Sequence, residues 1–378
     1  MGCDNAPESV NQLPDPVARG RTMVGPHLRS PDDLVSWPQF PEGTTSLLSK
    51  HLTKDIWDKY HDKSDEAGVS FKTCIFSGCK NLDSGIGVYA GSEQSYVAFK
   101  DFFDRIIQDY HGHGPNDSHV SNMDHTALNC PEFSAEEAAM VKSTRIRVGR
   151  NLANFPLGPG ITDADRDKVM QAVVEACSGF DGDLKGTFYP LDGMSDEVQT
   201  QLINDHFLFK EGDRFLEACG LNRNWPKGRG IFHNDAKTFL VWVNEEDQLR
   251  IISMQPGADI RQVFERLSRA ATAIEARASF SHNSHVGYIT SCPTNLGTAL
   301  RASVHIHLPK LMTDWPRFQE IADRYNVQIR GSHGEHSDTS DGIFDISNKR
   351  RLGRSEKDLV QDMYDGVKAM MQAELSMR

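Results

Sequence analysis

The sequence predicts an α+β protein in which a small helical part precedes a larger part of mixed strands and helices. Apolar residues recur at helical spacing in segments 46–63 and 96–111. By contrast, segments 238–243 and 249–255 are β-rich runs joined by a short polar turn, which is typical of a hairpin. Between the two parts, the segment from about residue 112 to about residue 129 is rich in Gly, Asn, Asp and Ser, so we expect a linker there.

The ends of the chain are predicted to differ. Seven prolines interrupt residues 1–42, so we expect an extended, disordered tail before the helical part. The last helix is expected to begin at Ser355, with Asp358 completing a capping box. Another helix, over 262–277, has an apolar stripe that should lie against a sheet. The apolar positions of these two helices are Val263, Leu267, Ala270, Ile274, Leu359, Met363, Val367 and Met370.

Composition restricts the class of protein. The 378 residues include 53 acidic and 41 basic ones, a formal net charge of −12, which argues against a nucleic-acid partner. No apolar run approaches the roughly 18 residues of a transmembrane segment, and no signal peptide opens the chain, so we expect a cytoplasmic protein. The seven cysteines lack CxxC pairs and are interpreted as mostly free thiols. Gly2 and Cys3 fit only part of a lipidation pattern, because Ala6 replaces a hydroxyl residue.

Three consecutive carboxylates, Glu245, Glu246 and Asp247, occupy the turn of the predicted hairpin. A turn with such residues is most often a solvent-exposed connection without a function, since the backbone conformation of turns favours these residue types. Five arginines suggest more than that. Arg145 and Arg147 would project from one strand face, and if Arg250, Arg301 and Arg330 converged with them, the guanidinium groups would form an anion site.

Two Gly-rich loops and two reactive residue types remain. SGIGVYAG (84–91) resembles a dinucleotide fingerprint only superficially, because no strand precedes it. GSHGEHSDTSDG (331–342) is expected to be a flexible lid or connection, with Glu335 its one candidate for catalysis. Cys292 is either an inert buried thiol or, beside arginines, a thiolate. For His305 and His307, hydrogen bonding or stacking is favoured over metal binding.

Several long segments together resemble the signature of the phosphagen (guanidino) kinases, the ATP:guanido phosphotransferases. They are STRIRVGR, DHFLFKEGDRF, GRGIFHND, TFLVWVNEED, CPTNLGTALRASVHIHLPKL, RGSHGEH and FDISNKRR. The resemblance covers roughly Thr45 to the C-terminus. It implies a small all-α N-terminal domain (43–120) and a catalytic domain (121–378) with an antiparallel β-sheet flanked by α-helices. The implied activity is reversible phosphoryl transfer from MgATP to a guanidino substrate, which gives ADP and an N-phosphoguanidine and buffers ATP.

The resemblance also implies site residues. Around the nucleotide these would be Arg145, Arg147, Arg250, Arg301 and Arg330 at the phosphates, with His206 and His305 near adenine or ribose. The catalytic residues would be Glu246 as base, with Cys292 and Glu335 binding the guanidinium. The tail of the substrate would meet Ser84, Gly85, Ile86, Gly87 and Tyr89. Glu245 and Asp247 would lie near Mg²⁺, through water, and Asp83 with Arg214 would form an inter-domain ion pair.

The identity of the guanidino substrate is left open by these motifs. The short loop KNLDSGIGVY favours arginine over creatine, while lombricine and taurocyamine kinases share such a loop. A protein-arginine kinase is disfavoured by the helical domain, and a silent nucleotide-binding scaffold by the retention of Glu246, Cys292 and the five arginines. The expected partners are ATP/ADP and a small guanidino compound. Both a monomer and a homodimer are compatible with the sequence.

Overall fold

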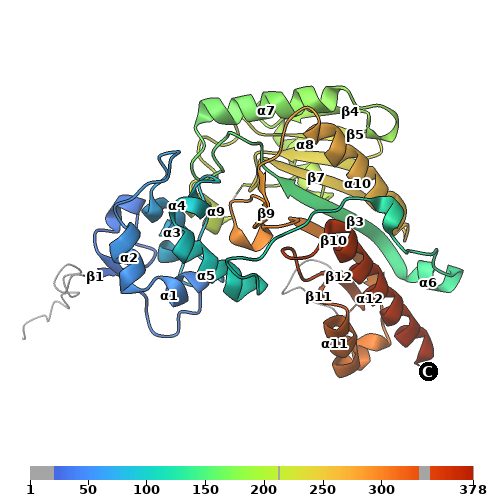
Figure 1. Cartoon of the computed structure of the whole chain (residues 1–378). Helices are drawn as coiled ribbons and strands as arrows, with labels where there is room; N and C mark the ends of the chain where they lie inside the picture. The colour runs from blue at the N-terminus through green and yellow to red at the C-terminus, as the bar shows by residue number, and fades with distance from the viewer. Residues whose placement is uncertain (1–20, 212, 332–340, 378) are drawn as a thin grey trace, which may run out of the picture.

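The computed structural model describes residues 21–211, 213–331 and 341–377. Figure 1 shows a group of short helices, in blue to teal, beside a larger part built around one broad sheet. In the described residues, no helix is long and apolar enough to cross a membrane.

The N-terminal part is helical, as predicted. Its helices are α1 (Leu47–His51), α2 (Lys54–Tyr60), α3 (Phe71–Lys80), α4 (Ser95–Ala98) and α5 (Lys100–His111). Aromatic rings fill its core, where Phe71 meets Phe99 edge-on at a centroid distance of 5.2 Å and Phe102 at 5.1 Å. This packing explains why helices too short to persist alone are stable together.

Residues 21–42 differ from the expected disordered tail. β1 (Arg21–Met23) pairs in parallel with β2 (Trp37–Gln39), and the 3-10 helix η1 (Pro31–Asp33) lies between them. Leu34 is fully buried in the core of the helical part. The prolines do prevent a periodic pattern, but aliphatic side chains at irregular spacing still anchor the segment. Residues 1–20 lie outside the described residues.

The larger part contains an eight-stranded sheet in the order β11-β12-β10-β3-β7-β6-β5-β4, and every neighbouring pair is antiparallel. The strands are β3 (Val141–Arg150), β4 (Gly186–Pro190), β5 (Gly230–Asn234), β6 (Phe239–Val243), β7 (Leu249–Pro256), β10 (Leu300–His307), β11 (Val327–Gly331) and β12 (Ile343–Asn348). The predicted hairpin is β6–β7. The α+β fold class with an antiparallel sheet is confirmed.

One face of this sheet is covered by long helices (Figure 1). They are α7 (Asp163–Ser178), α10 (Ile260–Glu275) and α12 (Glu356–Ser376). The predicted apolar stripes of α10 and α12 are buried, and the Ser355 side chain caps α12 by accepting from the Asp358 backbone N–H. The smaller elements are α6 (Ala135–Met140), α8 (Asp196–Asn204), α9 (Arg214–Ala218), α11 (Trp315–Arg324), β8 (His282–Asn283), β9 (Gly287–Tyr288) and the 3-10 turns η2 (His125–Ala127), η3 (Gly182–Leu184), η4 (Pro293–Asn295) and η5 (Leu311–Thr313).

Candidate active site

The register of the central strands brings the predicted arginines onto one face of the sheet. Arg301 on β10 lies directly opposite Arg147 on β3, and Arg250 on β7 lies opposite Gly149. Directly paired residues of an antiparallel ladder point to the same face, and alternate residues of a strand do as well. Arg145 therefore shares this face, which is the one that α10 and α12 leave uncovered.

The arginines on this face form a row across the strands, and this arginine row continues to the edge of the sheet. Arg330 on β11 and His305 on β10 both lie opposite Asp345 of β12. Arg301 Nη2 donates to Asp345 Oδ2 at 3.0 Å, and His305 Nε2 lies 3.4 Å from the same oxygen. Although burial favours the neutral acid, hydrogen bonds from His305 and Arg301 hold the pKa of Asp345 below its ordinary value. Asp345 thus partly neutralises this end of the cationic surface.

The centre of the row has too few anions. Burial, reinforced by the charges of Arg301 and Arg250, lowers the pKa of Arg145 to about 10. Burial lowers the pKa of Arg147 as well, and the charge of Arg250 is the largest of the repulsions that add to it. Nε and Nη2 of Arg145 are buried and have no hydrogen-bond partner among the residues that the structure describes. Guanidinium groups in this state would be stabilised by an anion with several oxygens, such as a polyphosphate.

The predicted carboxylate turn is folded against these arginines and is not merely solvated. Only 17% of the Glu246 side chain is exposed. Its Oε2 accepts from Arg250 Nη2 at 2.5 Å, and its Oε1 accepts from Asn295 Nδ2 at 3.2 Å. Burial raises the pKa of Glu246 to about 7, an effect that Arg250 opposes and that the neighbouring acids reinforce. A carboxylate with such a pKa can exchange a proton near neutral pH.

The other two acids of the turn have different environments. Glu245 Oε2 lies 3.3 Å from Arg250 Nε, and Glu245 faces the same cavity as Glu246. Asp247 is buried: its Oδ1 accepts from Asn151 Nδ2 at 2.9 Å. A Cβ at Gly149 would stand 2.8 Å from Asp247 Oδ2, so only glycine leaves room for this carboxylate. Asp247 is therefore placed to hold the turn against β3.

Cys292 precedes η4 and is buried beside the carboxylate turn. Burial raises the pKa of its thiol to about 12, and the nearby Glu246 charge acts in the same direction. Thr294 Oγ1 lies 3.0 Å from the sulfur and opposes this shift. The sequence left open a thiolate beside arginines, but burial and the neighbouring Glu246 carboxylate both favour the protonated thiol.

The loop expected to meet the substrate tail approaches the same place from the helical part. Gly85 O and Ile86 O accept from the first two backbone N–H groups of α1. Gly87 has φ of +78°, and a Cβ there would stand 2.9 Å from Leu48 Cβ, which favours glycine. Tyr89 packs with Cys292, and burial raises the pKa of its phenol. Ser84 lies buried at the start of this loop.

The other predicted residues lie at the domain boundary, in the loop after α8 or outside the described residues. Asp83 and Arg214 form an ion pair between the helical part and α9, and this hydrogen bond lowers the pKa of Asp83. His206 lies in the loop after α8, exposed, with φ of +63°. Glu335, like His333, lies outside the described residues.

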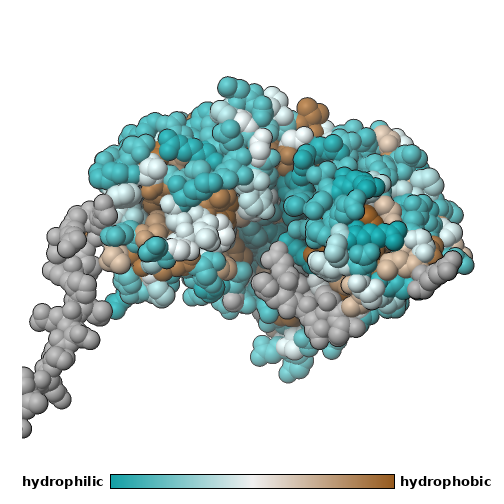
Figure 2. All heavy atoms as spheres, turned by 90° about the horizontal axis from the view of Figure 1, so that it is seen from below, coloured by the Kyte–Doolittle hydropathy of each residue, from teal (hydrophilic) through white to brown (hydrophobic). Residues whose placement is uncertain are grey.

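A cavity of about 180 Å³ brings together three of the predicted residues, Tyr89, Glu245 and Glu246. Its lining residues are Tyr89, Lys210, Asp213, Leu216, Asn222, Trp225, Glu245 and Glu246. Figure 2 shows a hydrophilic hollow between the two lobes of the molecule. Sequence reasoning assigned no role to Lys210, Asp213, Asn222 and Asn295. Lys210 and Asp213 lie within the motif DHFLFKEGDRF, and Asn295 lies three residues after Cys292, so these three carried a signal that could have revealed them, whereas Asn222 lies in none of the motifs.

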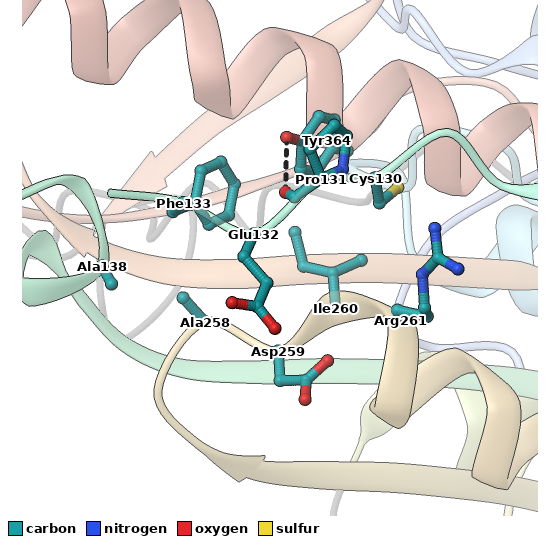
Figure 3. A pocket seen from close by; sticks show the side chains of 10 residues that line it. All are labelled: Cys130, Pro131, Glu132, Phe133, Ala138, Ala258, Asp259, Ile260, Arg261 and Tyr364. Atoms are coloured by element: carbon teal, nitrogen blue, oxygen red, sulfur yellow. Dashed lines mark hydrogen bonds between the residues drawn. The ribbon is translucent and has the colours of Figure 1, made fainter. Parts of the chain in front are cut away.

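A larger cavity, of about 570 Å³, lies beside α12 (Figure 3). Its walls include the stacked rings of Phe133 and Tyr364, and the carboxylates of Glu132 and Asp259. None of the predicted site residues lines it. Size alone therefore does not select the candidate active site, whose predicted residues are charged and lie elsewhere.

Residues 42–108 match the ATP:guanido phosphotransferase N-terminal domain, and residues 168–377 match the ATP:guanido phosphotransferase C-terminal catalytic domain. The chain is 51% identical to an arginine kinase of Artemia franciscana over 332 residues, 88% of this chain and 93% of that protein. A lombricine kinase crystal structure is 38% identical with a TM-score of 0.84, covering 92% of this chain and 96% of that one. The duplicated taurocyamine kinase of Schistosoma mansoni is 40% identical with a TM-score of 0.82, covering 88% of this chain and 47% of that one.

These matches confirm the resemblance found in the sequence. The chain belongs to the ATP:guanido phosphotransferase family, the phosphagen kinases. It is a kinase, a transferase of phosphoryl groups to a nitrogenous acceptor.

Proposed function

We propose that the chain transfers the γ-phosphoryl group of MgATP reversibly to arginine, giving ADP and N-phosphoarginine, and so buffers ATP in the cytoplasm. The observation that carries this proposal is the position of Glu246. Its carboxylate lies at the end of the arginine row, held by Arg250, and lines the cavity that reaches Tyr89. The phosphate site at the arginine row and the guanidine site in the cavity would therefore meet at Glu246, the proposed base.

The chemistry requires this arrangement. A guanidinium has a pKa above about 12, so one nitrogen must lose a proton as it attacks phosphorus. Glu246 would accept that proton. Arg145, Arg147, Arg250, Arg301 and Arg330 would surround the phosphates and stabilise the charge of the transferred group. Holding both substrates in line can supply about 7–11 kcal/mol, so the protein needs no covalent intermediate.

The proposed places of the remaining residues follow the family resemblance. Tyr89 with the loop Ser84–Gly87 would meet the tail of the substrate, and Cys292 with Glu335 would flank its guanidinium. His305, at the edge of the row, and His206 would lie near adenine or ribose. Because a free guanidinium would bring positive charge next to Cys292, the thiol pKa should fall when substrate binds.

The donor chemistry fits a magnesium ion that arrives with the nucleotide. No cluster of three metal-binding side chains occurs in the part of the chain that the structure describes. Mg²⁺ usually keeps several waters and binds through one or two carboxylates plus substrate phosphates. Glu245, which faces the cavity, is the better placed of the two predicted carboxylates, since Asp247 is buried behind Gly149. When bound, the ion would neutralise phosphate charge.

We retain a helical domain (43–120) and a catalytic domain (121–378), and the packing of Leu34 adds residues 21–42 to the helical domain. The family matches, over 42–108 and 168–377, support a division into two domains. A monomer and a homodimer both remain compatible with this proposal. The partners proposed are ATP/ADP and the small guanidino substrate.

An ADP-production assay with MgATP and arginine, lombricine, taurocyamine, glycocyamine or creatine tests the proposal, with Glu246→Gln as control. Preference for arginine is expected, because an arginine kinase is 51% identical over most of the chain. Preference for lombricine or taurocyamine would favour the second candidate, which the two solved structures support. Turnover only on protein arginine, or on nothing, would contradict the proposal of a metabolite kinase.

A further inference from the structure

Residues 290–295 form the turn that carries Cys292. This turn belongs to the catalytic domain in the sequence, but it is hydrogen-bonded to the helical domain. Ala90 N–H donates to Ser291 O at 2.7 Å, and Ser291 Oγ donates back to Ala90 O at 2.9 Å. The Tyr96 hydroxyl donates to Thr290 O at 2.8 Å. All three bonds are buried or lie at buried residues, where exchange with water is restricted.

A fourth bond reaches the turn from the end of α5. His111 Nε2 lies 2.8 Å from Pro293 O. A carbonyl can only accept, so Nε2 must carry the proton. Burial lowers the pKa of His111 to about 4, which keeps the ring neutral and a donor at physiological pH.

Packing is consistent with these hydrogen bonds. Val286, Ile289 and Leu296, which flank the turn on both sides, are buried in the same apolar cluster as the helices α1 to α5. These three side chains therefore share the core of the helical domain, whereas Tyr288 and the strand β10 that follows the turn belong to the core of the sheet.

This turn ends in Asn295, whose side chain reaches the proposed base. Asn295 Nδ2 donates to Glu246 Oε1, while Arg250 holds Oε2. In the described part of the chain, Asn295 makes no other side-chain hydrogen bond. The turn itself is closed by a backbone bond from Asn295 N–H to Cys292 O at 3.0 Å, which does not depend on the side chain.

We propose that Asn295 is a positioning residue for Glu246, and that the helical domain sets its place through the four bonds to residues 290–293 of this turn. With one donor on each oxygen, the carboxylate plane is fixed. The helical domain would then position the base relative to the substrate loop Ser84–Tyr89, which belongs to the same domain. This inference rests on the proposed role of Glu246.

The first test compares Asn295→Ala with Asn295→Asp, a variant of the same shape that cannot donate when ionised. Loss of a hydrogen bond to a charged group should lower kcat about tenfold to a hundredfold in both variants, and the KM for the nucleotide should change little. The acid limb of the kcat/KM profile should move to higher pH, since the ionised carboxylate loses a donor. Unfolding midpoints close to wild type would show that both variants fold.

Combining Asn295→Ala with Glu246→Asp separates this inference from the proposed function. If Asn295 acts through Glu246, its removal should cost much less when the shorter aspartate carboxylate at position 246 is already out of reach. Equal costs in both backgrounds, or a wild-type kcat and pH profile in both Asn295 variants, would overturn the inference. Full activity in Glu246→Gln would instead overturn the role of the base itself.

The contribution of the helical domain is tested at His111. His111→Gln can still donate to Pro293 O from a similar position, whereas His111→Ala cannot. We expect a several-fold fall in kcat for the alanine variant and partial rescue by glutamine. His61→Ala is the matched control, because His61 also bonds a backbone carbonyl, that of Trp57, but within its own helical segment. An equal fall in the control and His111→Ala would refute domain positioning.

Discussion

Arg147 of β3 and Arg301 of β10 lie directly opposite one another on an open face of the sheet. Cross-strand neighbours of like charge destabilise a sheet, and burial, with repulsion from Arg250, Arg145 and Arg301, lowers the pKa of Arg147. A phosphagen kinase without nucleotide would therefore store unfavourable charge at its phosphate site. Nucleotide binding should relieve it.

Replacement of this arginine should separate stability from function. Arg147→Gln is expected to raise the free energy of unfolding of the nucleotide-free protein by about 1 kcal/mol, because it removes an uncompensated charge. The same change should lower kcat/KM for MgATP by about 10²–10³, the cost of losing a donor to transition-state charge. Chemical denaturation with and without MgADP, together with initial rates, checks both. A destabilised variant that retained its nucleotide-induced stabilisation would contradict the argument.

The Glu246 carboxyl should leave a pH signature in stability. Its pKa is raised by burial to about 7 from an ordinary 4.5, so the folded state holds this proton more tightly than the unfolded chain. Ionising the group costs stability progressively between about pH 4.5 and 7, and the full cost applies above that range. Glu246→Gln should match wild type near pH 4.5 and exceed it above pH 7, by up to about 3 kcal/mol. Urea denaturation across this range is the measurement, and a pH-independent difference would show that Arg250 fully compensates the charge.

Much of this site could be predicted because its residues follow strand periodicity. Arg145 and Arg147 are two apart on one strand, so a shared face follows from the pleat alone. Which strand lies opposite is a matter of register, and the pairing of Arg147 with Arg301, far apart in the chain, has no local signal. The family resemblance implied only that both arginines would surround the phosphates.

The features that residue spacing did not settle have a common cause in burial. The carboxylate turn resembles a solvated turn in sequence, yet Asp247 is buried because Asn151 and Gly149 accommodate it from another part of the chain. The Cys292 pKa is raised because the thiol is buried beside Glu246. Likewise Leu34 is anchored by contacts to distant helices. Pairwise tertiary contacts of this kind are not encoded by spacing.

Cys292 should behave as a residue that orients substrate and not as a covalent nucleophile. Cys292→Ser is expected to keep measurable turnover with kcat reduced about tenfold to a hundredfold, whereas Glu246→Gln should lose about 10²–10⁴. Because burial raises the thiol pKa to about 12, alkylation of the free enzyme near pH 7 should be slow. Rates of iodoacetamide modification against pH, with Cys292→Ser to identify the reacting thiol, provide the measurement. Trapping of a phosphorylated Cys292 would refute the role.

The segment 21–42 should contribute to the stability of the helical domain even though sequence patterns assign it to a tail. Leu34 is completely buried among the helices, while the next residue, Val35, is 68% exposed. Leu34→Ala should therefore lower the free energy of unfolding by about 2–5 kcal/mol, the usual cost of a buried cavity. Val35→Ala is the matched control and should change it by less than about 0.5 kcal/mol. Equal effects in urea denaturation would mean that the segment does not pack on the domain, whereas a selective loss at Leu34 would extend the folded domain to residue 21.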